Sequence, residues 1–451
     1  MNACSKALVL VAGLTSLFAT YWDDAWHTDI GRDDALIPPH LLLFGSVAVV
    51  GVAVAAWGLA ELRRTGSLVA VLKRPPLLIA AAGGVCTLAS APVDAAWHAV
   101  FGRDAVLWSP PHMLTVFGTL ALLGGVFAAG AQARWIPPVC AALLLGVAVT
   151  AVLEFETDVP QFDERLYLPV LLVAALYAAA LARALTPSAY TISGGVLLYL
   201  LIRLAVTGVL TLLGHTAPDL PLAVAGLAVM DLRWKRPLHA YAAGAAGVAL
   251  TSALASATGL SSVPPDAVLV VAAAVVAGAL AVRMRFAALL LAPLALLAVP
   301  EQAVAHDPGQ GRAIARAALT VTSDGRGTLT LAAQVREGCA GLRPARVVAR
   351  RAGRALTGTL TPSGCTFAGT LRVPEHGLWF LYAEWRQGAE TWLPVHADAA
   401  GTLTEVRDIY LPPTRTGGAG PAISGLLLYT LGLMLLWLTI RLARSGTARA
   451  R

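Results

Sequence analysis

The run LLLFGSVAVVGVAVAAWGLA, from Leu41 to Ala60, contains 20 residues and no charged side chain. An α-helix of this length rises about 30 Å, which matches the hydrocarbon thickness of a membrane. Similar runs recur along the first 305 residues and once more near the end of the chain. The whole sequence is 57% hydrophobic and 13% charged, whereas soluble proteins carry about 25% charged residues. We therefore expect a polytopic α-helical membrane protein, with the lipid bilayer as its first partner.

The apolar runs predict about 12 membrane spans, one of which, near residues 219–232, is short for a full crossing. Arg203 falls in the middle of another span, which indicates either a buried partner or a water-filled cavity. The predicted spans cover approximately residues 5–22, 39–61, 76–97, 111–131, 136–154, 167–185, 190–213, 219–232, 238–260, 265–282, 285–304 and 421–441.

Lys and Arg residues cluster in alternate loops between the predicted spans, and short loops rich in these residues stay in the cytoplasm. One such loop holds Arg63, Arg64, Lys73 and Arg74, and the chain ends in the cationic run RLARSGTARAR. We therefore expect both termini to be cytoplasmic, in a bacterial-type inner (plasma) membrane. This topology accounts for much of the net charge of +7, so the charge gives no reason to expect a nucleic-acid partner.

Residues 305–418 differ in composition, with short β-rich runs such as CTFAGTLRV and GLWFLYAEW between turn signals. Roughly seven strands with alternating apolar residues predict an antiparallel, all-β sandwich of immunoglobulin or cupredoxin type. The topology makes this domain extracytoplasmic, where Cys339 and Cys365 could form a disulfide. Residues 419–451 follow as a final transmembrane anchor and cytoplasmic tail.

The segment before this domain, RMRFAALLLAPLALLAVPEQAVAHDPG, allows two interpretations. Its basic start, apolar run and Ala303-Val304-Ala305 ending are typical of a secretory signal, and cleavage there would make His306 a new N-terminus. Alternatively, the segment is an uncut eleventh span that leads into the β domain, since internal cleavage would split the polypeptide.

A motif rich in Asp, His and Trp immediately precedes the apolar run at Leu41–Ala60, and a similar motif follows later in the chain. WDDAWHTDIGRDDALIPPH extends from Trp22 to His40, and VDAAWHAVFGRDAVLWSPPH extends from Val93 to His112. Each copy lies at the outer end of a predicted helical hairpin within residues 1–131, and further helices occupy residues 132–304. We interpret the two copies as a tandem repeat of the hairpin.

Each copy supplies one carboxylate and two imidazoles. Asp23 and His27 are four residues apart and share a face if the first helix continues through them, and His40 returns at the start of the next span. The second copy repeats this arrangement with Asp94, His98 and His112. Two His and one carboxylate are a common ligand set for copper, zinc or iron, so we predict two metal sites.

The residues around these ligands repeat as well. Arg32-Asp33 and Arg103-Asp104 follow the first His of each copy by five residues, and they could orient the ligands or form an ion pair. A purely structural alternative is that Asp and His cap helix ends, Trp forms an aromatic belt and Pro starts the next helix. Duplication of a hairpin would copy such residues too.

In the form D-x3-H-x12-H, the first copy resembles a metal motif in the C subunit of the copper membrane monooxygenases, the particulate methane and ammonia monooxygenase family. The second copy, D-x3-H-x13-H, is similar to the second metal motif of that subunit, with Asp94 where the family has Asn. The resemblance covers roughly residues 5–131, and at its widest it extends to about residue 215, less than half of the chain. It implies copper in an outward-facing, intramembrane site, and zinc is the next candidate by ligand type.

The β domain followed by a single span resembles, more loosely, the cupredoxin-bearing B subunit of the same family, whose mature chain begins with His. This resemblance makes His306, His376 and His396 candidate metal ligands in the β domain. Because the proteins that it resembles are subunits of an assembly, the resemblance also implies other subunits as partners.

Three functions remain open. The resemblance implies a copper enzyme that oxidises a small apolar substrate or ammonia with O2, and such an enzyme needs an apolar pocket that reaches at least one motif. The alternative is a copper-handling protein that captures, stores or delivers the ion without oxygenase activity. The third is a structural subunit in which bound ions stabilise the two motifs.

The acidic outer loop EFETDVPQFDERLY (residues 154–167) either concentrates cations or is simply solvated.

Overall fold

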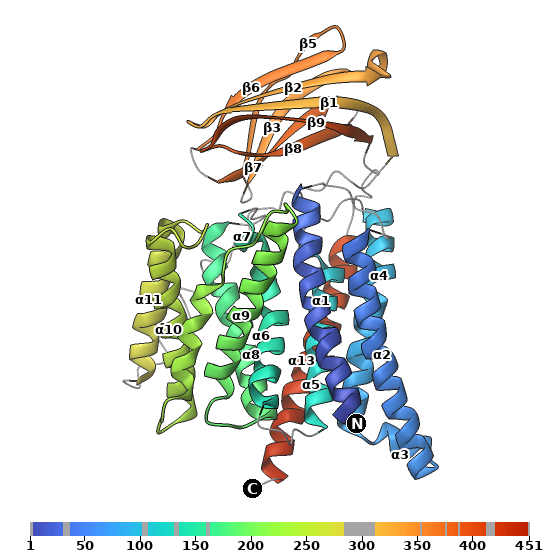
Figure 1. Ribbon diagram of the computed structural model, residues 1–451, viewed down its shortest axis with the longest axis vertical. Coiled ribbons are helices and arrows are strands. Elements are labelled where there is room, and N and C mark those ends of the chain that lie inside the picture. Colours follow the sequence, from blue (N-terminus) through green and yellow to red (C-terminus); the bar gives the residue numbers. More distant parts are fainter. Residues whose placement is uncertain are drawn as a thin grey trace.

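The computed structural model describes residues 3–29, 37–101, 107–129, 135–158, 163–283, 312–351, 354–374, 377–386, 388–411 and 420–449. Within these residues the chain forms a bundle of helices with a β domain seated on one end (Figure 1). The first helix begins, and the last helix ends, at the opposite end of the bundle.

The helices follow the predicted apolar runs, and proline opens several of them because its missing N–H is not needed in the first turn. The helices are α1 (Ala3–Asp29), α2 (Pro38–Thr65), α3 (Leu68–Leu72), α4 (Pro75–Phe101), α5 (Pro110–Ala128), α6 (Ile136–Val149), η1 (Thr150–Val152), α7 (Leu153–Glu156), η2 (Glu164–Leu166), α8 (Tyr167–Leu185), α9 (Thr191–Leu212), η3 (Leu222–Asp231), α10 (Pro237–Ala257), α11 (Pro265–Arg283) and α13 (Gly420–Arg449).

Nine helices among the described residues are long and apolar enough to cross a membrane. The expected span at residues 5–22 forms α1, a helix of 27 residues that is not among the nine. The expected span at 219–232, which the sequence gives as short for a full crossing, forms a 3-10 helix of 10 residues. Such a helix rises about 20 Å, which is less than the hydrocarbon thickness. The expected span at 285–304 lies outside the described residues.

The second hairpin is tightly packed because glycine lets its two helices approach backbone to backbone. A Cβ added at Gly83 of α4 would lie 2.5 Å from the carbonyl oxygen of Gly118 in α5. A Cβ added at Gly125 of α5 would lie 2.5 Å from the backbone nitrogen of Ala80 in α4. Small residues at such positions are typical of closely packed helices in membranes. The glycines therefore set the relative position of α4 and α5.

The last helix, α13, returns to the bundle and packs beside α5 and α8 (Figure 1). The Tyr177 hydroxyl of α8 donates a hydrogen bond to the Leu436 carbonyl of α13 at 3.1 Å. At the β-domain end, the Tyr429 hydroxyl of α13 donates to the Trp108 carbonyl, next to the start of α5. The final helix is thus an integral part of the bundle.

The β domain is antiparallel, as expected, and its nine strands form one sheet in the order β4-β3-β7-β8-β9-β1-β2-β6-β5. A single residue pair, Glu390 with Tyr410, joins the four-stranded part to the five-stranded part, and β3 and β4 also contact β6. The two layers expected of a sandwich are therefore halves of one folded sheet. The strands are β1 (Arg312–Asp324), β2 (Thr328–Glu337), β3 (Pro344–Arg351), β4 (Arg354–Thr359), β5 (Thr361–Ser363), β6 (Thr366–Arg372), β7 (Leu378–Trp385), β8 (Glu390–His396) and β9 (Ala400–Leu411).

The core of the β domain lies between these two layers. Trp379, Leu381 and Trp385 of β7 point into it, and they are joined there by Phe367 of β6. Cys339 and Cys365 form the disulfide that the sequence permits, with a Cα–Cα distance of 5.6 Å. The bridge ties the turn after β2 to the start of β6.

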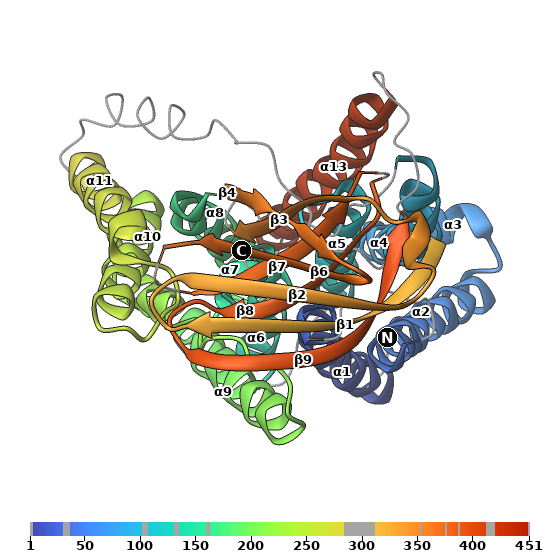
Figure 2. The same cartoon turned by 90° about the horizontal axis from the view of Figure 1, so that it is seen from above.

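The β domain is attached to the helices by a charged contact at the end of α7. Arg351 of β3 donates to the Asp158 carboxylate at 2.6 Å and to the Glu164 carboxylate at 3.1 Å. The backbone N–H of Leu378 donates to the other Asp158 oxygen at 2.8 Å. The Arg351 side chain is only 5% exposed, so the contact is shielded from water. Figure 2 shows the sheet extending across the end of the bundle, above α6 and α7.

Loss of the disulfide should destabilise the β domain. The bridge spans 26 residues, and closing a loop of that length stabilises a fold by about 3 kcal/mol. Replacing both Cys339 and Cys365 by Ser should lower the free energy of unfolding of this domain by that amount, measured in urea by tryptophan fluorescence. Cys86→Ser, at a free cysteine, should leave the same transition in place.

Loss of the Arg351 contact should loosen the seating of the β domain. Arg351→Gln leaves the Asp158 carboxylate without its cation, and breaking a shielded pair of this kind costs about 3 kcal/mol. Hydrogen exchange at the Leu378 amide should accelerate accordingly. Arg316→Gln is the matched control, because Arg316 pairs with Asp408 at 2.8 Å but is 67% exposed. Equal exchange at Leu378 in both variants would contradict the assignment.

Candidate functional site

The two repeated hairpins form the same local structure. In the first, the His40 Nε2 of α2 lies 3.1 Å from the Asp23 Oδ1 of α1. In the second, the His112 Nε2 of α5 lies 3.3 Å from the Asp94 Oδ1 of α4. We call each Asp–His pair a corner: the first corner is Asp23 with His40, and the second corner is Asp94 with His112.

Local sequence explains why each corner forms. Two prolines begin α2 and two begin α5, and the His follows immediately as the third residue of the helix. Ile37 precedes α2 in an extended conformation, and the Ser109 hydroxyl caps α5 by accepting the His112 N–H at 3.4 Å. Each imidazole therefore lies in the first turn of its helix, where it faces the Asp of the preceding helix.

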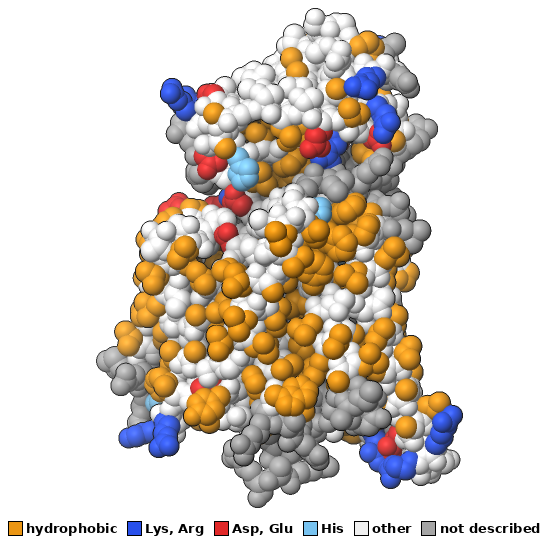
Figure 3. Space-filling model, viewed as in Figure 1, with side chains coloured by type: hydrophobic (Ala, Val, Ile, Leu, Met, Phe, Trp, Pro, Cys, Tyr) orange, Lys and Arg blue, Asp and Glu red, His pale blue; other side chains and the backbone are white. Residues whose placement is uncertain are grey.

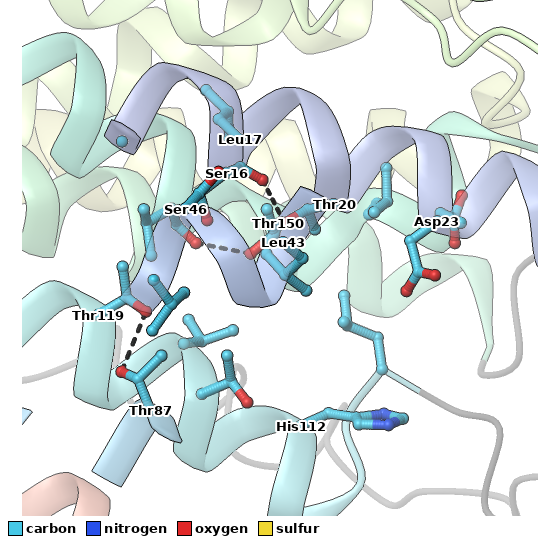
Figure 4. A pocket seen from close by; sticks show the side chains of 18 of the residues that line it. Ser16, Leu17, Thr20, Asp23, Leu43, Ser46, Thr87, His112, Thr119 and Thr150 are labelled. Carbon is cyan, nitrogen blue, oxygen red and sulfur yellow. Dashed lines mark hydrogen bonds between the residues drawn. The ribbon is translucent and has the colours of Figure 1, made fainter. Parts of the chain in front are cut away.

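Both corners line the same cavity, of about 230 Å³, between α1, α2, α4, α5 and α6. Asp23, His40, Asp94 and His112 all contribute to its wall. Figure 4 shows Asp23 and His112 at one end of this cavity, although they come from different hairpins. The repeated motifs therefore meet in space at one cavity, which their spacing in the sequence did not predict.

Away from the corners, the cavity wall is apolar and studded with hydroxyl groups (Figure 4). Leu17, Val50 and Leu143 are among its apolar side chains. The hydroxyls of Thr87 and Thr119 lie 3.3 Å apart, and Thr87 also bonds to the Gly83 carbonyl at 3.0 Å. Since the Thr87 proton goes to the Gly83 carbonyl, the Thr119 hydroxyl donates to the Thr87 oxygen, and the Thr119 oxygen keeps its lone pairs for a cavity ligand. The cavity can thus hold a small molecule with an apolar body.

The predicted ligands are only partly described. The α1 helix continues to Asp29 and α4 to Phe101, so Asp23–His27 and Asp94–His98 are each one turn apart on a continuous helix. The side chains of His27 and His98 lie outside the described residues. Six other predicted site residues also lie outside the described residues: Arg32, Asp33, Arg103, Asp104, His306 and His376.

Each corner supplies two donor atoms within the described part of the chain. Among those residues, no three His, Cys, Asp or Glu side chains are grouped so that they could hold a metal ion. His396, the described candidate of the β domain, lies at the end of β8 with Nδ1 3.9 Å from the Asp398 carboxylate. Its side chain is 58% exposed.

The acidic segment at α7 is not simply solvated. Glu154 and Glu156 are 5% and 4% exposed, respectively. Glu154 lines the cavity and accepts the Leu107 N–H at 2.6 Å, just before the start of α5. Asp158 holds Arg351 of the β domain. The sequence signal was the alternation of acids at residues 154, 156 and 158, but it did not say what each acid contacts.

Arg203 has the buried partner that its place in an apolar run indicated. Its Nη1 donates to the Glu156 carboxylate at 2.6 Å and to the Tyr21 hydroxyl at 2.7 Å. The Tyr199 hydroxyl lies 3.2 Å from both Nη1 and the Tyr21 hydroxyl. Nη2 donates to the Asp219 carbonyl at 2.8 Å. A guanidinium with no exposed surface is thus neutralised, and α1, α7 and α9 are tied together.

No known family model, curated protein or solved structure matches this chain.

Replacing one partner of the buried ion pair should destabilise the protein more than replacing both partners. Arg203→Leu leaves the Glu156 carboxylate uncompensated, which should lower the free energy of unfolding by about 3–5 kcal/mol. Replacing both Arg203 and Glu156 by Leu should recover a large part of this loss, since no charge then remains buried. Unfolding of the purified protein in detergent would measure both. A single variant as stable as the unaltered chain would rule out a structural ion pair.

Proposed function

We propose that this protein is a multi-pass membrane protein that binds copper at the two Asp–His corners and presents it to a small molecule in the shared cavity. The observation that carries this proposal is the convergence of both corners on one cavity of about 230 Å³. Two metal corners with a common cavity are suited to hold a substrate within reach of either metal.

The surface of the helical part supports a membrane location. Large apolar side chains face outward on many helices, including Val52 of α2 at 69% exposure and Val173 of α8 at 74%. Figure 3 shows a broad belt of apolar side chains on the helical part, and the Lys and Arg side chains of this part gather at the end away from the β domain. Cations mark the cytoplasmic side of membrane proteins, and disulfides form outside the cytoplasm. We therefore propose cytoplasmic termini and an extracytoplasmic β domain of immunoglobulin or cupredoxin type.

The donor atoms of each corner fit a metal ion. Imidazole nitrogen and carboxylate oxygen both bind copper and zinc. Ligand atoms about 2.1 Å from one metal stand about 3 Å apart, and the corners have separations of 3.1 Å and 3.3 Å. An Asp–His hydrogen bond has a similar length, so the test must measure the metal itself. By their spacing, His27 and His98 are proposed as the third ligands.

The cavity supports the enzymatic form of the proposal. A copper enzyme of the monooxygenase type needs an apolar pocket that reaches a metal corner, and this cavity reaches both. Bound copper with open coordination positions would supply the redox chemistry for oxidation by O2. The protein's own residues would hold the metal and offer apolar walls to a small substrate. Ammonia or a small hydrocarbon would fit the available volume.

The hydroxyl groups of the cavity support a second candidate, copper handling without oxygenase activity. Ser16, Thr20, Ser46 and Thr150 line the cavity together with Thr87 and Thr119. Hydroxyl oxygens are hard donors, so such a wall would suit a hydrated Cu(II) ion that passes inward from the corners rather than Cu(I), which prefers sulfur ligands. Substrate-dependent O2 consumption by the copper-loaded protein, with a reductant and a small hydrocarbon or ammonia, would favour the enzyme. Copper uptake into vesicles without that consumption would favour handling.

Copper binding should depend on the imidazoles of the corners. Equilibrium dialysis of the purified protein against copper, and separately against zinc, should show stoichiometric metal. His40→Ala and His112→Ala should each weaken one site by at least about 10-fold, and the double variant should lose both sites. His396→Ala, at an exposed His of the β domain, is the control and should retain both corner sites. Unchanged binding in the double variant would refute the assignment of the corners.

A further inference from the structure

The short helix α7 contacts both hairpins through alternate residues. Its carboxylates, Glu154 and Glu156, are two residues apart and are both buried. Glu154 binds the segment that leads into the second hairpin's α5, whereas Glu156 binds Arg203, which in turn reaches α1 of the first hairpin. One four-residue helix thus supports both corners.

The contact of Glu154 holds the approach to His112. The Leu107 N–H donates to the Glu154 carboxylate at 2.6 Å, and charge-assisted bonds of this kind are stronger than neutral ones. The next residue, Trp108, donates its indole N–H to the Ala151 carbonyl of η1 at 2.7 Å. Ser109 then caps α5 at His112. The backbone that delivers the second imidazole is therefore fixed at three consecutive residues.

The contact of Glu156 holds the helix that carries Asp23. Arg203 binds the Glu156 carboxylate at 2.6 Å and the Tyr21 hydroxyl at 2.7 Å. Its guanidinium carbon also lies 4.0 Å from the centre of the Tyr21 ring, a cation–π distance. Tyr21 precedes Asp23 by two residues on α1. A shift of the guanidinium would therefore move the first carboxylate relative to His40.

We propose that Glu154 is a positioning residue for the second corner, and that Glu156, acting through Arg203 and Tyr21, positions the first corner. This inference rests on the proposed copper binding. Residues that orient metal ligands typically change metal affinity by about 10- to 100-fold when they are replaced. Because the two acids support different hairpins, each should affect the affinity of one corner and leave the other unchanged. General destabilisation would weaken both.

The test isolates each corner by a substitution in the other. In His40→Ala protein only the second corner keeps its described pair, and in His112→Ala protein only the first does. Copper(II) affinity of full-length protein in detergent is measured by equilibrium dialysis, together with the paramagnetic resonance spectrum of the bound ion. Thermal unfolding of every variant is recorded beside these measurements.

Glu154→Leu removes the acceptor of the Leu107 N–H, whereas Glu154→Gln keeps an acceptor oxygen and serves as the matched control. In the His40→Ala background, Glu154→Leu should weaken copper binding by about 10- to 100-fold and alter the spectrum. The copper affinity of the Glu154→Gln variant should stay within about threefold of that of the His40→Ala parent. In the His112→Ala background, neither change should alter affinity.

Tyr21→Phe provides the reciprocal arm and keeps the ring while it removes the hydroxyl that accepts from Arg203. It should weaken copper binding in the His112→Ala background only, by about 10-fold or more. This arm also keeps the proposal testable if Glu154→Leu does not fold. Equal effects in both backgrounds, or none in either, would overturn the positioning roles. Unaltered protein that binds no copper would refute the proposed function itself, and the positioning roles with it.

Discussion

The buried ion pair between Glu156 and Arg203 is the contact on which the arrangement of the helices most depends. Neither charge can remain in an apolar bundle without the other, because burying an isolated charge costs several kcal/mol (roughly 3–5 when one partner is removed). This constraint sets α7 against α9, and the remaining donors of Arg203 add α1 and the Asp219 carbonyl. Glu154 lies two residues before Glu156 and contacts the second hairpin. Asp158 lies two residues after Glu156 and contacts the β domain. Residues 154–158 therefore connect the first hairpin, the second hairpin and the β domain.

The two corners have the same local design but different surroundings. Both place an Asp near the end of one helix and a His in the first turn of the next. The second hairpin is packed backbone to backbone through Gly83 and Gly118, and a serine caps the helix that carries its His. The first hairpin has no side-chain cap at α2 and is held from the side by Arg203. The two similar motifs thus have different supports, because Gly83, Gly118 and Arg203 lie outside both motifs.

The shared cavity brings two different kinds of wall together. Carboxylates and imidazoles gather at one end, while apolar and hydroxyl-bearing side chains line the remainder. The final helix contributes to this architecture too, since Tyr429 holds the segment before His112 in place.

The sequence by itself determined most of the elements and singled out candidate ligands. Runs of uncharged residues predicted the helices, alternation predicted the β domain, and the repeated spacing singled out six residues: Asp23, His27, His40, Asp94, His98 and His112. These features are local, because helix length, capping and the fold of a hairpin depend on residues within a few turns of one another. The same reasoning showed that residues 219–232 are short for a full crossing, but it did not specify a 3-10 helix there.

Only the tertiary structure decided that both corners open into one cavity and that the acids at residues 154–158 are buried and paired. Each of these facts joins residues far apart in the chain, such as Tyr21 with Arg203 or Asp158 with Arg351. Spacing along a single sequence carries no information about such distances. The partner of a buried charge is chosen by the packing of whole helices, and that packing exists only once the chain has folded.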